Sequence, residues 1–590
     1  LRRDGGAAAV ESYLAEWDGR NMVTYAKLMP TANKLQVEAG INALIAERTD
    51  DDYKTLLQSL PDAHLDSRGN VFDDFNRNKG DRQEVVMLAG IAVFMLFIAA
   101  FNFMNLSTAR SAVRAKEVGV RKIVGATRRQ LIQQYLQESL LLVFAAAVIG
   151  VVLLSELAPL VALPLARDYV DYFLAHGGLI MGALLALVLL GLLSGSYPAF
   201  VLSSVSPVAV LKGKFAASTH GIWLRRLLVV VQFTLSIAII IGMLVVYRQV
   251  EFMKNLNPGF DANGVVNIPL EDDVLAGNYE VLRNRLLELP QVQSVAGSSS
   301  MPGGNLPKGP FLRRADGDAI VTSGLEVDER YLATLGMRLV AGRNYSRENP
   351  ADANESIIIN ESAARALGWE DAVGNSVQMF RVTRTVIGVV EDFHFAGMRN
   401  KIEPVALAYT DEVNVMSVRI DSNATREALA GIETAWREVN PDYPFSYRLF
   451  ADEYNKLLKD DEKFSAMLIQ FAFIAVIIAC LGLYGLASFN ADQKTKEIGV
   501  RKVLGAGSGT LLKVVLNEYV VLLAVANLLA WGAAWLVMQE WLAGFAYRAE
   551  LGASSFVLAT MVTAVLALLA VGREIVKVVR GKPVNALRYE

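Results

Sequence analysis

Residues 116–126 read KEVGVRKIVGA, and residues 496–506, 380 positions later, read KEIGVRKVLGA. A long apolar stretch precedes each copy and another follows it. Each copy is therefore predicted to be a charged loop at a membrane face. Positive charge at a membrane face requires Lys and Arg, but it does not require a fixed order of Glu, Gly and Ala. The repeated order therefore indicates a docking surface that the molecule needs twice.

The composition favours a membrane protein over a soluble one. Of the 590 residues, 53% are hydrophobic and 20% are charged, whereas a soluble domain carries about 25% charged residues. The net charge of −3 lacks the basic footprint of a nucleic-acid-binding protein. The single cysteine, Cys480, excludes a disulfide within one chain. The four histidines are scattered, so the sequence predicts no metal site.

Seven apolar stretches reach the length of about 20 residues that a membrane-spanning helix needs. They are residues 85–107, 139–160, 178–202, 227–247, 465–489, 515–538 and 554–572. Buried helices of a soluble enzyme rarely reach this length seven times in one chain. The sequence therefore predicts a multi-pass α-helical membrane protein.

The charges between the spans predict the orientation of the chain. Lys and Arg gather in four segments, with seven in 108–137, four in 203–226, five in 490–514 and five after residue 572. The short segments 161–177 and 539–553 hold one each. By the positive-inside rule, the two motif segments and the C-terminus are cytoplasmic. Residues 1–84 and 250–463 are then periplasmic or otherwise extracytoplasmic, and the protein lies in the bacterial inner membrane.

The duplication extends beyond the motif. Glu138 and Glu518 stand at the same offset of 380. Residues 73–76 resemble 452–455, and residues 207–212 resemble 583–588. Each unit is thus an external domain, a span, the motif, a span, a short external loop, a span and a Pro-Val tail. Parallel repeats of this kind fit transport machinery, in which two halves face each other.

The repeats predict the domain organisation. We expect a remnant of a first external domain at 1–84, a first membrane unit at 85–226, the leading span of the second unit at 227–247, a second external domain at 250–463, and a second membrane unit at 465–590. The chain begins at Leu1 and shows no signal segment. We therefore expect a fragment of a longer protein that would have eight spans and two external domains.

The large external segment alternates short apolar strands with helical stretches. Strands are predicted at 265–269, 356–359, 385–390 and 413–420, and helices at 279–289, 361–367 and 425–439. This pattern predicts an α+β domain large enough to bury a core. Asp392 and His394 could form half of an acid–base pair, but such a pair is more often a hydrogen-bonding element of a loop. No catalytic constellation emerges from the sequence.

The order of residues in the motif has a physical interpretation. Glu117 and Arg121 are four residues apart, as are Glu497 and Arg501, a spacing that pairs the two charges on a helix. The glycines that follow each Glu disfavour a long helix, and the Gly-Ala pairs suit a tight turn. Thr127 and Gln130 have the spacing of a capping box. We therefore predict a short cationic helix, a turn, and a membrane helix.

These residues resemble a known family. The E-x-G-x-R-x-x-x-G-A pattern between spans is similar to the cytoplasmic loop of FtsX/MacB-type permeases of ABC transporters. Residues 339–343, 357–364, 373–374 and 386–393 are similar to the periplasmic core domain of that family. The resemblance covers nearly the whole chain. The first unit departs from the pattern, because it lacks its leading span and most of its periplasmic domain.

The resemblance implies that the motif loops dock on a separate ABC-type ATP-binding subunit, which binds ATP and Mg. It implies docking residues Glu117, Gly119, Arg121, Lys122, Gly125 and Ala126 in the first copy, and Glu497, Gly499, Arg501, Lys502, Gly505 and Ala506 in the second. The chain itself contains no G-x-x-x-x-G-K-[ST] sequence. We therefore expect a non-enzymatic subunit without a cofactor of its own, two ATPase copies, and a periplasmic adaptor or outer-membrane component as a further candidate partner.

Three functions remain open at this point. The first is a permease that uses ATPase motion to export or extract a substrate from the periplasm. The second is a non-transporting mechanotransmitter that regulates a cell-envelope hydrolase or senses antimicrobial peptides. The third is a membrane-bound enzyme, which would need clustered ionisable residues in the spans. The sequence offers mainly Glu156, together with Glu138 and Glu518, which we interpret as helix anchors. Neither the substrate, the direction of its movement nor the oligomeric state follows from the sequence.

Overall fold

The computed structural model describes residues 24–48, 55–60, 62–65, 80–157, 172–203, 219–270, 272–301, 306–314, 317, 319–379, 382–504 and 506–580. The chain forms two compact units. We call the first the sheet unit; it comprises Leu1–Val86, Gly259–Ala396 and Ile402–Glu453. We call the second the helical unit; it comprises Met87–Pro258, Gly397–Lys401 and Tyr454–Glu590.

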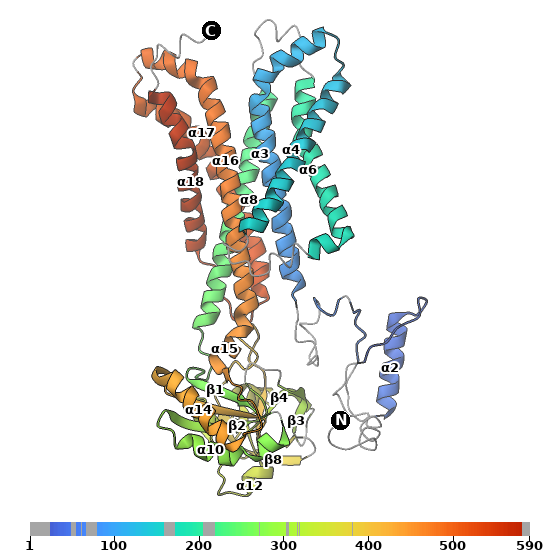
Figure 1. The fold of residues 1–590 in the computed structure, drawn as a ribbon, viewed down its shortest axis with the longest axis vertical. Coiled ribbons are helices and arrows are strands. Elements are labelled where there is room, and N and C mark those ends of the chain that lie inside the picture. The colour runs from blue at the N-terminus through green and yellow to red at the C-terminus, as the bar shows by residue number, and fades with distance from the viewer. Residues whose placement is uncertain are drawn as a thin grey trace. The chain divides into compact units, whose positions relative to one another are not determined.

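Seven long helices make up the described part of the helical unit (Figure 1). They are α3 (Arg82–Ile123), α4 (Arg128–Leu157), α6 (Gly177–Ser203), α8 (Thr219–Asn255), α16 (Lys459–Val503), α17 (Ser508–Ala543) and α18 (Ala553–Arg580). Each contains a segment that is long and apolar enough to cross a membrane. The prediction of a seven-span membrane protein is confirmed.

The prediction of a separate short helix at the motif is wrong. α3 runs without interruption from its apolar span through Gly119 to Ile123, and α16 runs in the same way through Gly499 to Val503. A glycine inside a helix costs only about 1 kcal/mol. Packing of the helix around it, described below, outweighs that cost.

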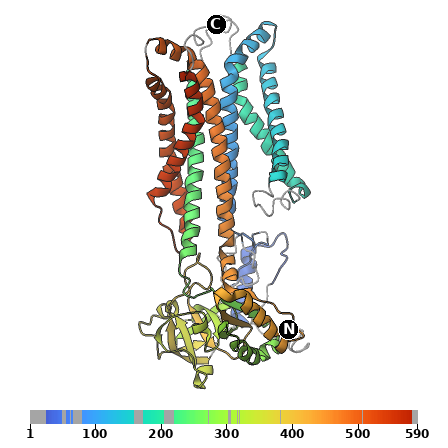
Figure 2. The same ribbon diagram turned by 60° about the vertical axis from the view of Figure 1, so that its left-hand side comes forward.

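The helices pack in two groups. α4 packs against α6, while α8 packs against α16, α17 and α18. Figures 1 and 2 show α3 beside α16, and Val118 of α3 packs with residues of α4 and α6, so α3 contacts both groups. Glu518 of α17 accepts hydrogen bonds from Arg226 of α8, with oxygen–nitrogen distances of 2.7 and 3.1 Å. Glu518 therefore anchors two helices, as predicted.

The sheet unit contains two lobes, each with its own core. The first lobe uses β1 (Val265–Pro269), α10 (Tyr279–Leu287), β2 (Val292–Ser298), β10 (Val415–Ile420), α14 (Thr425–Val439) and β11 (Arg448–Leu449). Its strands are antiparallel in the order β11-β1-β10-β2. This is the order of a ferredoxin-like β-α-β-β-α-β fold. Trp436 and Leu286 on the two helices pack on the strands in the core.

The second lobe is inserted between β2 and β10. It consists of β3 (Lys308–Arg314), β4 (Ala319–Val327), α11 (Tyr331–Thr334), β5 (Leu339–Gly342), α12 (Ala351–Asn354), β6 (Ser356–Asn360), α13 (Glu361–Ala366), β7 (Ser376–Met379), β8 (Val382–Val390) and β9 (Val405–Tyr409). β4 pairs with β3 on one side and, in parallel, with β9 on the other, so these strands close on themselves. Among the described residues, the strand pairing between β2 and β4 that joins this lobe to the sheet of the first is a single ladder pair, Ser298–Val327.

The predicted α+β fold of the external segment is confirmed. Every predicted strand and helix of that segment overlaps an observed one, and β1 and α14 match their predicted bounds. The predicted boundaries of the domains stay predictions. Residues 1–23 and 66–79 of the first domain, and the repeat segments 73–76, 207–212 and 583–588, lie outside the described residues.

Candidate docking site at the duplicated motif

The first motif ends α3 and turns the chain into α4. The Ala126 N–H donates to the Arg121 carbonyl at 2.9 Å, and the Val124 N–H donates to the Val120 carbonyl at 3.1 Å. Gly125 adopts φ +106°, a left-handed conformation that disfavours other residues. These bonds satisfy carbonyls that a helix end would leave without partners. The predicted tight turn is confirmed.

The second motif ends α16 with the same backbone bonds. The Ala506 N–H donates to the Arg501 carbonyl at 2.9 Å, and the Leu504 N–H donates to the Val500 carbonyl at 3.0 Å. Gly505 lies outside the described residues, and so does the side chain of Glu497. The two copies of the motif therefore fold alike where both are described.

The predicted ion pair of the first motif is present. Arg121 donates to Glu117 at 2.6 Å within α3, and through its other terminal nitrogen to Gln134 of α4 at 2.6 Å. Both charged side chains of the pair are about half exposed, at 43% and 55%. Arg121 thus links α3 to α4 while its charge remains accessible to a partner.

Lys122 contacts the end of a neighbouring helix, and its predicted part in docking stays a prediction. Its ammonium donates to the carbonyl of Ser203, the last residue of α6, at 2.6 Å. Arg128 donates to the hydroxyl of the same serine at 3.4 Å. Cations at a helix C-terminus stabilise the exposed carbonyls. Lys122 therefore joins the end of α6 to the motif.

Thr127 begins α4 with the predicted capping box. The Gln130 side-chain oxygen accepts from the Thr127 N–H at 2.9 Å, and the Thr127 hydroxyl oxygen accepts from the Gln130 N–H at 3.4 Å. These reciprocal bonds set where α4 starts. The turn between α3 and α4 is consequently defined on both sides.

Buried apolar side chains hold the motif against its neighbours. Val118 packs with Leu131 and Tyr135 of α4 and with Ala199 of α6. In the second copy, Ile498 and Leu511, at the offset of 380 from Val118 and Leu131, are also buried. Because Val118 lies next to Gly119, this packing explains why α3 continues through the glycine.

Three apolar residues of each motif remain exposed, and the sequence interpretation overlooked them. Val120, Ile123 and Val124 are 57%, 57% and 82% exposed, and their counterparts Val500, Val503 and Leu504 are 44%, 63% and 80% exposed. Their spacing of three and four residues places them on one helix face. We call each set an apolar triplet.

Lipid does not account for the apolar triplets. The apolar stretches that precede the triplets end near residues 107 and 489, and Arg110, Arg114, Lys116, Lys494 and Lys496 follow them. At 1.5 Å per residue, Ile123 lies about 24 Å farther along its helix than residue 107, and Val503 about 21 Å farther than residue 489. Exposed apolar patches rimmed by polar groups mark interaction sites. The sequence contained a signal for these exposed residues, because the charged residues of each motif stand among them.

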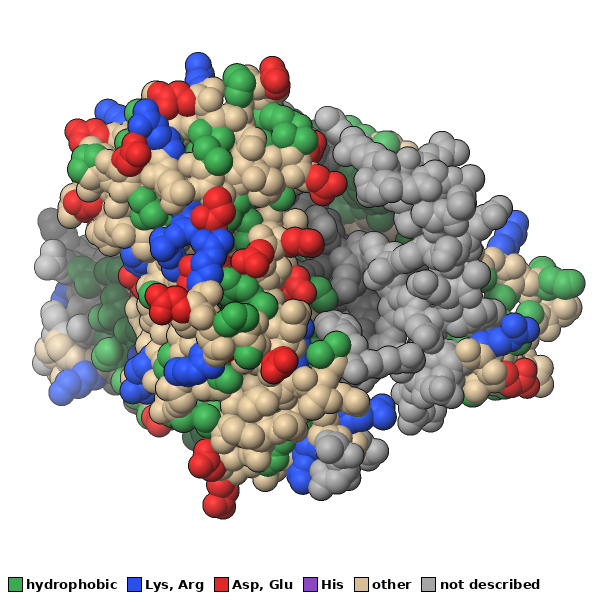
Figure 3. Space-filling view, turned by 90° about the horizontal axis from the view of Figure 1, so that it is seen from below, with side chains coloured by type: hydrophobic (Ala, Val, Ile, Leu, Met, Phe, Trp, Pro, Cys, Tyr) green, Lys and Arg blue, Asp and Glu red, His purple; other side chains and the backbone are tan. Residues whose placement is uncertain are grey.

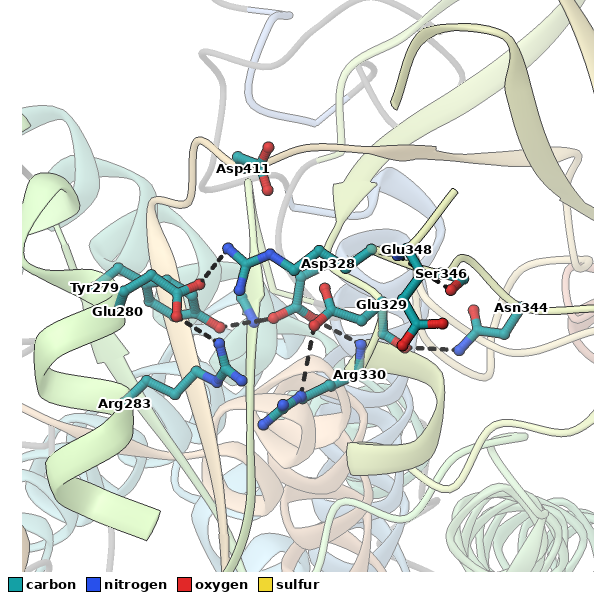
Figure 4. Close-up of polar contacts among 12 residues, drawn as sticks. Tyr279, Glu280, Arg283, Asp328, Glu329, Arg330, Asn344, Ser346, Glu348 and Asp411 are labelled. Atoms are coloured by element: carbon teal, nitrogen blue, oxygen red, sulfur yellow. Dashed lines mark hydrogen bonds and ion pairs between the residues drawn. The ribbon is translucent and has the colours of Figure 1, made fainter. Parts of the chain in front are cut away.

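The sheet unit offers a second polar cluster, shown in Figure 4, in which Tyr279 and Asp328 point toward each other. The buried Asp328 carboxylate accepts from the Tyr279 hydroxyl at 2.6 Å and from the Gly297 N–H at 2.7 Å. Burial raises the pKa of Asp328, and burial together with the nearby Asp328 charge raises the pKa of Tyr279. Because Tyr279 and Asp328 belong to different lobes, the cluster joins the lobes.

Asp392 is a hydrogen-bonding centre rather than half of an acid–base pair. Its carboxylate accepts from the Asn360 amide at 2.9 Å, from the Ser362 N–H and hydroxyl at 2.8 Å each, and from Arg365. His394 is buried nearby. This confirms the interpretation of residues 392–395 as a hydrogen-bonded loop.

The described residues provide no group of three or more His, Cys, Asp or Glu side chains that could hold a metal ion. Figure 3 shows acidic and basic side chains interleaved on one face of the sheet unit, so the charge of the coloured part of this face favours neither an anionic nor a cationic ligand. The duplicated turn is therefore the best-defined candidate site.

Two protein families match the chain. The FtsX-like permease C-terminal family matches residues 89–207 and 469–582, once for each repeat. The MacB-like periplasmic core domain family matches residues 227–433, between them. Together the two families cover both motifs and most of the sheet unit.

Curated relatives are similar to part of the chain. The macrolide export ATP-binding/permease protein MacB of Sodalis glossinidius is 26% identical over 217 residues, which are 34% of this chain and 33% of that protein. The protein of the same name from Bdellovibrio bacteriovorus is 27% identical over 169 residues, 28% of this chain and 25% of that protein. The chain thus spans about a third or less of the length of these relatives.

The solved periplasmic region of MacB from Actinobacillus actinomycetemcomitans is similar to 35% of this chain at 15% identity, with a TM-score of 0.27 and 97% of that structure covered. The family assignment rests on two FtsX-like segments with one motif each, on the MacB-like periplasmic core domain between them, and on seven apolar helices. The chain belongs to the FtsX/MacB-type permeases of ABC transporters.

Proposed function

We propose that this permease couples ATP hydrolysis by a separate ATPase to motion of the sheet unit, which drives export or extraction of a substrate. The ATPase docks at the two motif turns, one copy on each, and supplies the ATP and Mg site. The observation that carries the proposal is the pair of apolar triplets, each exposed beside an ordered, charged turn.

The site has the composition of a protein interface. Apolar side chains provide the buried centre of an interface, and arginine is enriched around it. Val124 and Leu504, each about four-fifths exposed, would fill pockets on the ATPase. Glu117 and Arg121 would form the polar rim, with Arg121 held in place by Gln134.

The helices give a route for the motion. α16 runs unbroken for 45 residues, from Lys459 to Val503, and at 1.5 Å per residue it is about 68 Å long. A continuous helix is stiff along its axis, so displacement at the motif is transmitted to its other end. We propose that the motif ends are cytoplasmic and that residues 250–463 lie in the periplasm of an inner-membrane protein, where an adaptor or outer-membrane component would meet them.

Substitutions in the apolar triplets test the docking. Val124→Asp and Leu504→Asp each place a charge in one exposed apolar triplet without disturbing a buried core. We expect each single variant to retain about half of the ATPase that the wild type brings down from native membranes, and the double variant to retain almost none. Val281→Asp, at a 60% exposed position of α10 in the sheet unit, is the matched control. An ATPase that stays with the double variant would rule out this site.

A second measurement separates transport from regulation. Substrate-stimulated ATP hydrolysis that also moves the substrate would support the permease. Activation of a cell-envelope hydrolase without substrate movement would support a mechanotransmitter instead. Both outcomes leave the docking site unchanged, because the two functions differ in what the sheet unit contacts.

A further inference from the structure

The two motif turns share their backbone bonds but differ in the residues that follow them. The motifs match closely up to Ala126 and Ala506, and the offset of 380 continues to Glu138 and Glu518. Between these points, a capping residue, two arginines and a glutamine of the first copy are replaced by small or apolar residues in the second. The equivalent pairs are Thr127 and Gly507, Arg128 and Ser508, Arg129 and Gly509, and Gln134 and Val514.

The first turn is held more firmly than the second on the side of its following helix. Thr127 begins α4 with a capping box, and Gln134 accepts a hydrogen bond from Arg121 at 2.6 Å. α17 begins after Gly507, which has no side chain to cap the helix, and its second residue is Gly509. Glycine leaves the backbone more freedom to lose on ordering. Docking at the second turn therefore orders more of the chain, which lowers affinity.

The two arginines of the first turn are not explained by the fold of α4. Arg128 and Arg129 are its first two residues, and both side chains are exposed. Positive charge at a helix N-terminus opposes the helix dipole. The positive-inside rule does not require these arginines either, because the second repeat has Ser508 and Gly509 at the same positions.

Both arginines belong to the surface around the first apolar triplet. Four and five residues of chain reach at most about 14 and 18 Å, which limits the distances from Val124 to Arg128 and Arg129. A standard interface covers about 800 Å² of each partner, a disc about 16 Å in radius. The second copy has Lys513 instead, but this lysine lies about 8 Å farther along α17 than Ser508.

A protein partner accounts for these charges better than lipid does. The apolar stretch of α4 starts near residue 139, so Arg128 lies about 16 Å before it along the helix. The headgroup layer of a bilayer is only about 5–8 Å thick on each side. The arginines are therefore placed beyond the headgroups, at the level of the exposed triplet.

We propose that the two turns are unequal docking sites, and that Arg128 and Arg129 bind an acidic patch on the ATPase copy that docks at the first turn. This copy binds first, and its affinity depends on salt. The second copy is held mainly by its apolar triplet. The inference rests on the proposed function, which assigns one copy to each turn. Two copies of one ATPase that meet two different surfaces bind with different affinities.

Binding to one turn at a time tests the inequality. In the full chain, Leu504→Asp leaves the first turn intact, and Val124→Asp leaves the second. The dissociation constant of the ATPase that the wild type brings down is measured for both variants, at about 0.05 and 0.5 M salt. We expect the first turn to bind about fivefold to tenfold more tightly at low salt and less than about threefold more tightly at high salt. With ATPase in excess both turns fill, so each variant still retains about half.

Transfer of the charges between the turns identifies their contribution. Arg129→Gln, added to Leu504→Asp, keeps the contact of Arg128 with Ser203 and should weaken the first turn about threefold. Ser508→Arg/Gly509→Arg, added to Val124→Asp, should strengthen the second turn at least threefold and make its affinity depend on salt.

A neutral substitution is the matched control for the transferred charges. Ser508→Gln/Gly509→Gln removes the glycine without adding charge, so it should produce no salt dependence. Because the arginine transfer predicts a gain of affinity, a misfolded variant cannot imitate it. A gain of the same size in the glutamine variant would show that helix formation, and not charge, distinguishes the turns.

The possible outcomes separate this inference from the proposed function. Equal dissociation constants with equal salt dependence would overturn the inequality and leave docking intact. A wild-type chain that binds no ATPase would end the proposed function and this inference together. The measurements are repeated in bilayers that contain anionic lipid. Loss of the first turn's advantage there would assign the arginines to lipid headgroups and overturn the proposal, whereas its persistence would support the ATPase as the partner.

Discussion

Arg399 and Asp461 form an ion pair with nitrogen and oxygen 2.9 Å apart, and the Arg399 guanidinium lies 4.7 Å from the centre of the Phe545 ring. Residues 397–401 group with the helical unit, although the residues on either side of them belong to the sheet unit. Asp461 begins the apolar span of α16. Arg399 thus fastens a segment that follows β8 to the helix that carries the second motif.

We expect Arg399→Met to destabilise the helical unit, because the Asp461 side chain is only 7% exposed and would lose a charged partner. Breaking a buried pair costs up to about 3–5 kcal/mol. Arg399→Met/Asp461→Leu should lose less than the sum of the two single variants. Thermal unfolding in detergent measures the stability of the wild type, the two single variants and the double variant. Strictly additive losses would show that the pair is not coupled.

Charge reversal should separate stability from docking at the first motif. Glu117→Arg and Arg121→Glu should each change stability by less than about 1 kcal/mol, because exposed pairs contribute little. Each should weaken binding of the purified ATPase at least tenfold. Exchanging both residues restores the pair but removes the bond from Arg121 to Gln134, so partial recovery is expected. Wild-type affinity in both single variants would exclude this rim from the interface.

Two glycines of the sheet unit provide a matched comparison of backbone strain. Gly342 and Gly374 both have positive φ angles, +75° and +89°. A Cβ on Gly342 would lie 2.1 Å from the Ile387 carbonyl oxygen, whereas Gly374 has no atom within 4 Å. Gly374→Ala should cost about 1–2 kcal/mol from conformation alone. Gly342→Ala should cost clearly more, and equal unfolding midpoints would contradict the close approach of β5 and β8.

His394 should make the sheet unit less stable in mild acid. Burial lowers the pKa of His394 below its ordinary value of 6.5, against the opposing charge of Asp392. The unfolded chain then binds the proton more readily, so this contribution is complete above about pH 6.5 and is lost as the pH falls through the folded-state pKa. The slope cannot exceed about 1.4 kcal/mol per pH unit.

His394→Gln should remove that part of the pH dependence. The measurement is hydrogen exchange of sheet-unit peptides at pH values from 7.5 to 5, corrected for the intrinsic exchange rate. The wild type should lose protection as the pH falls, and the variant should lose less. The same loss in both proteins would assign the effect to other groups.

Local features of the fold could be predicted from the sequence. The seven spans depend on the length of each apolar stretch, and the turn after α3 depends on Gly125 and on the Thr127–Gln130 box, which are neighbours in the chain. The pairing of Glu117 with Arg121 required only their spacing. Each of these interactions joins residues within a few positions of one another.

The candidate site could be predicted only in part. The motif identified its position, but the assignment of Lys122 to docking did not anticipate that its ammonium binds the Ser203 carbonyl, 81 residues away. The apolar triplets were overlooked because Val and Ile are normally buried. Which face of α3 remains exposed depends on α4 and α6, which cover Val118 and leave Val124 open.

The sequence by itself determined a duplicated membrane protein with two similar motifs, because hydrophobic length, repeat offset and turn chemistry are properties of short segments. Only the tertiary structure decided that α3 and α16 continue through their glycines, that one lobe of the sheet unit is inserted into another, and that Asn102 meets Gly482. These features depend on contacts between different elements, from 13 positions apart for Val118 and Leu131 to 380 for Asn102 and Gly482, whose free energy no local pattern encodes.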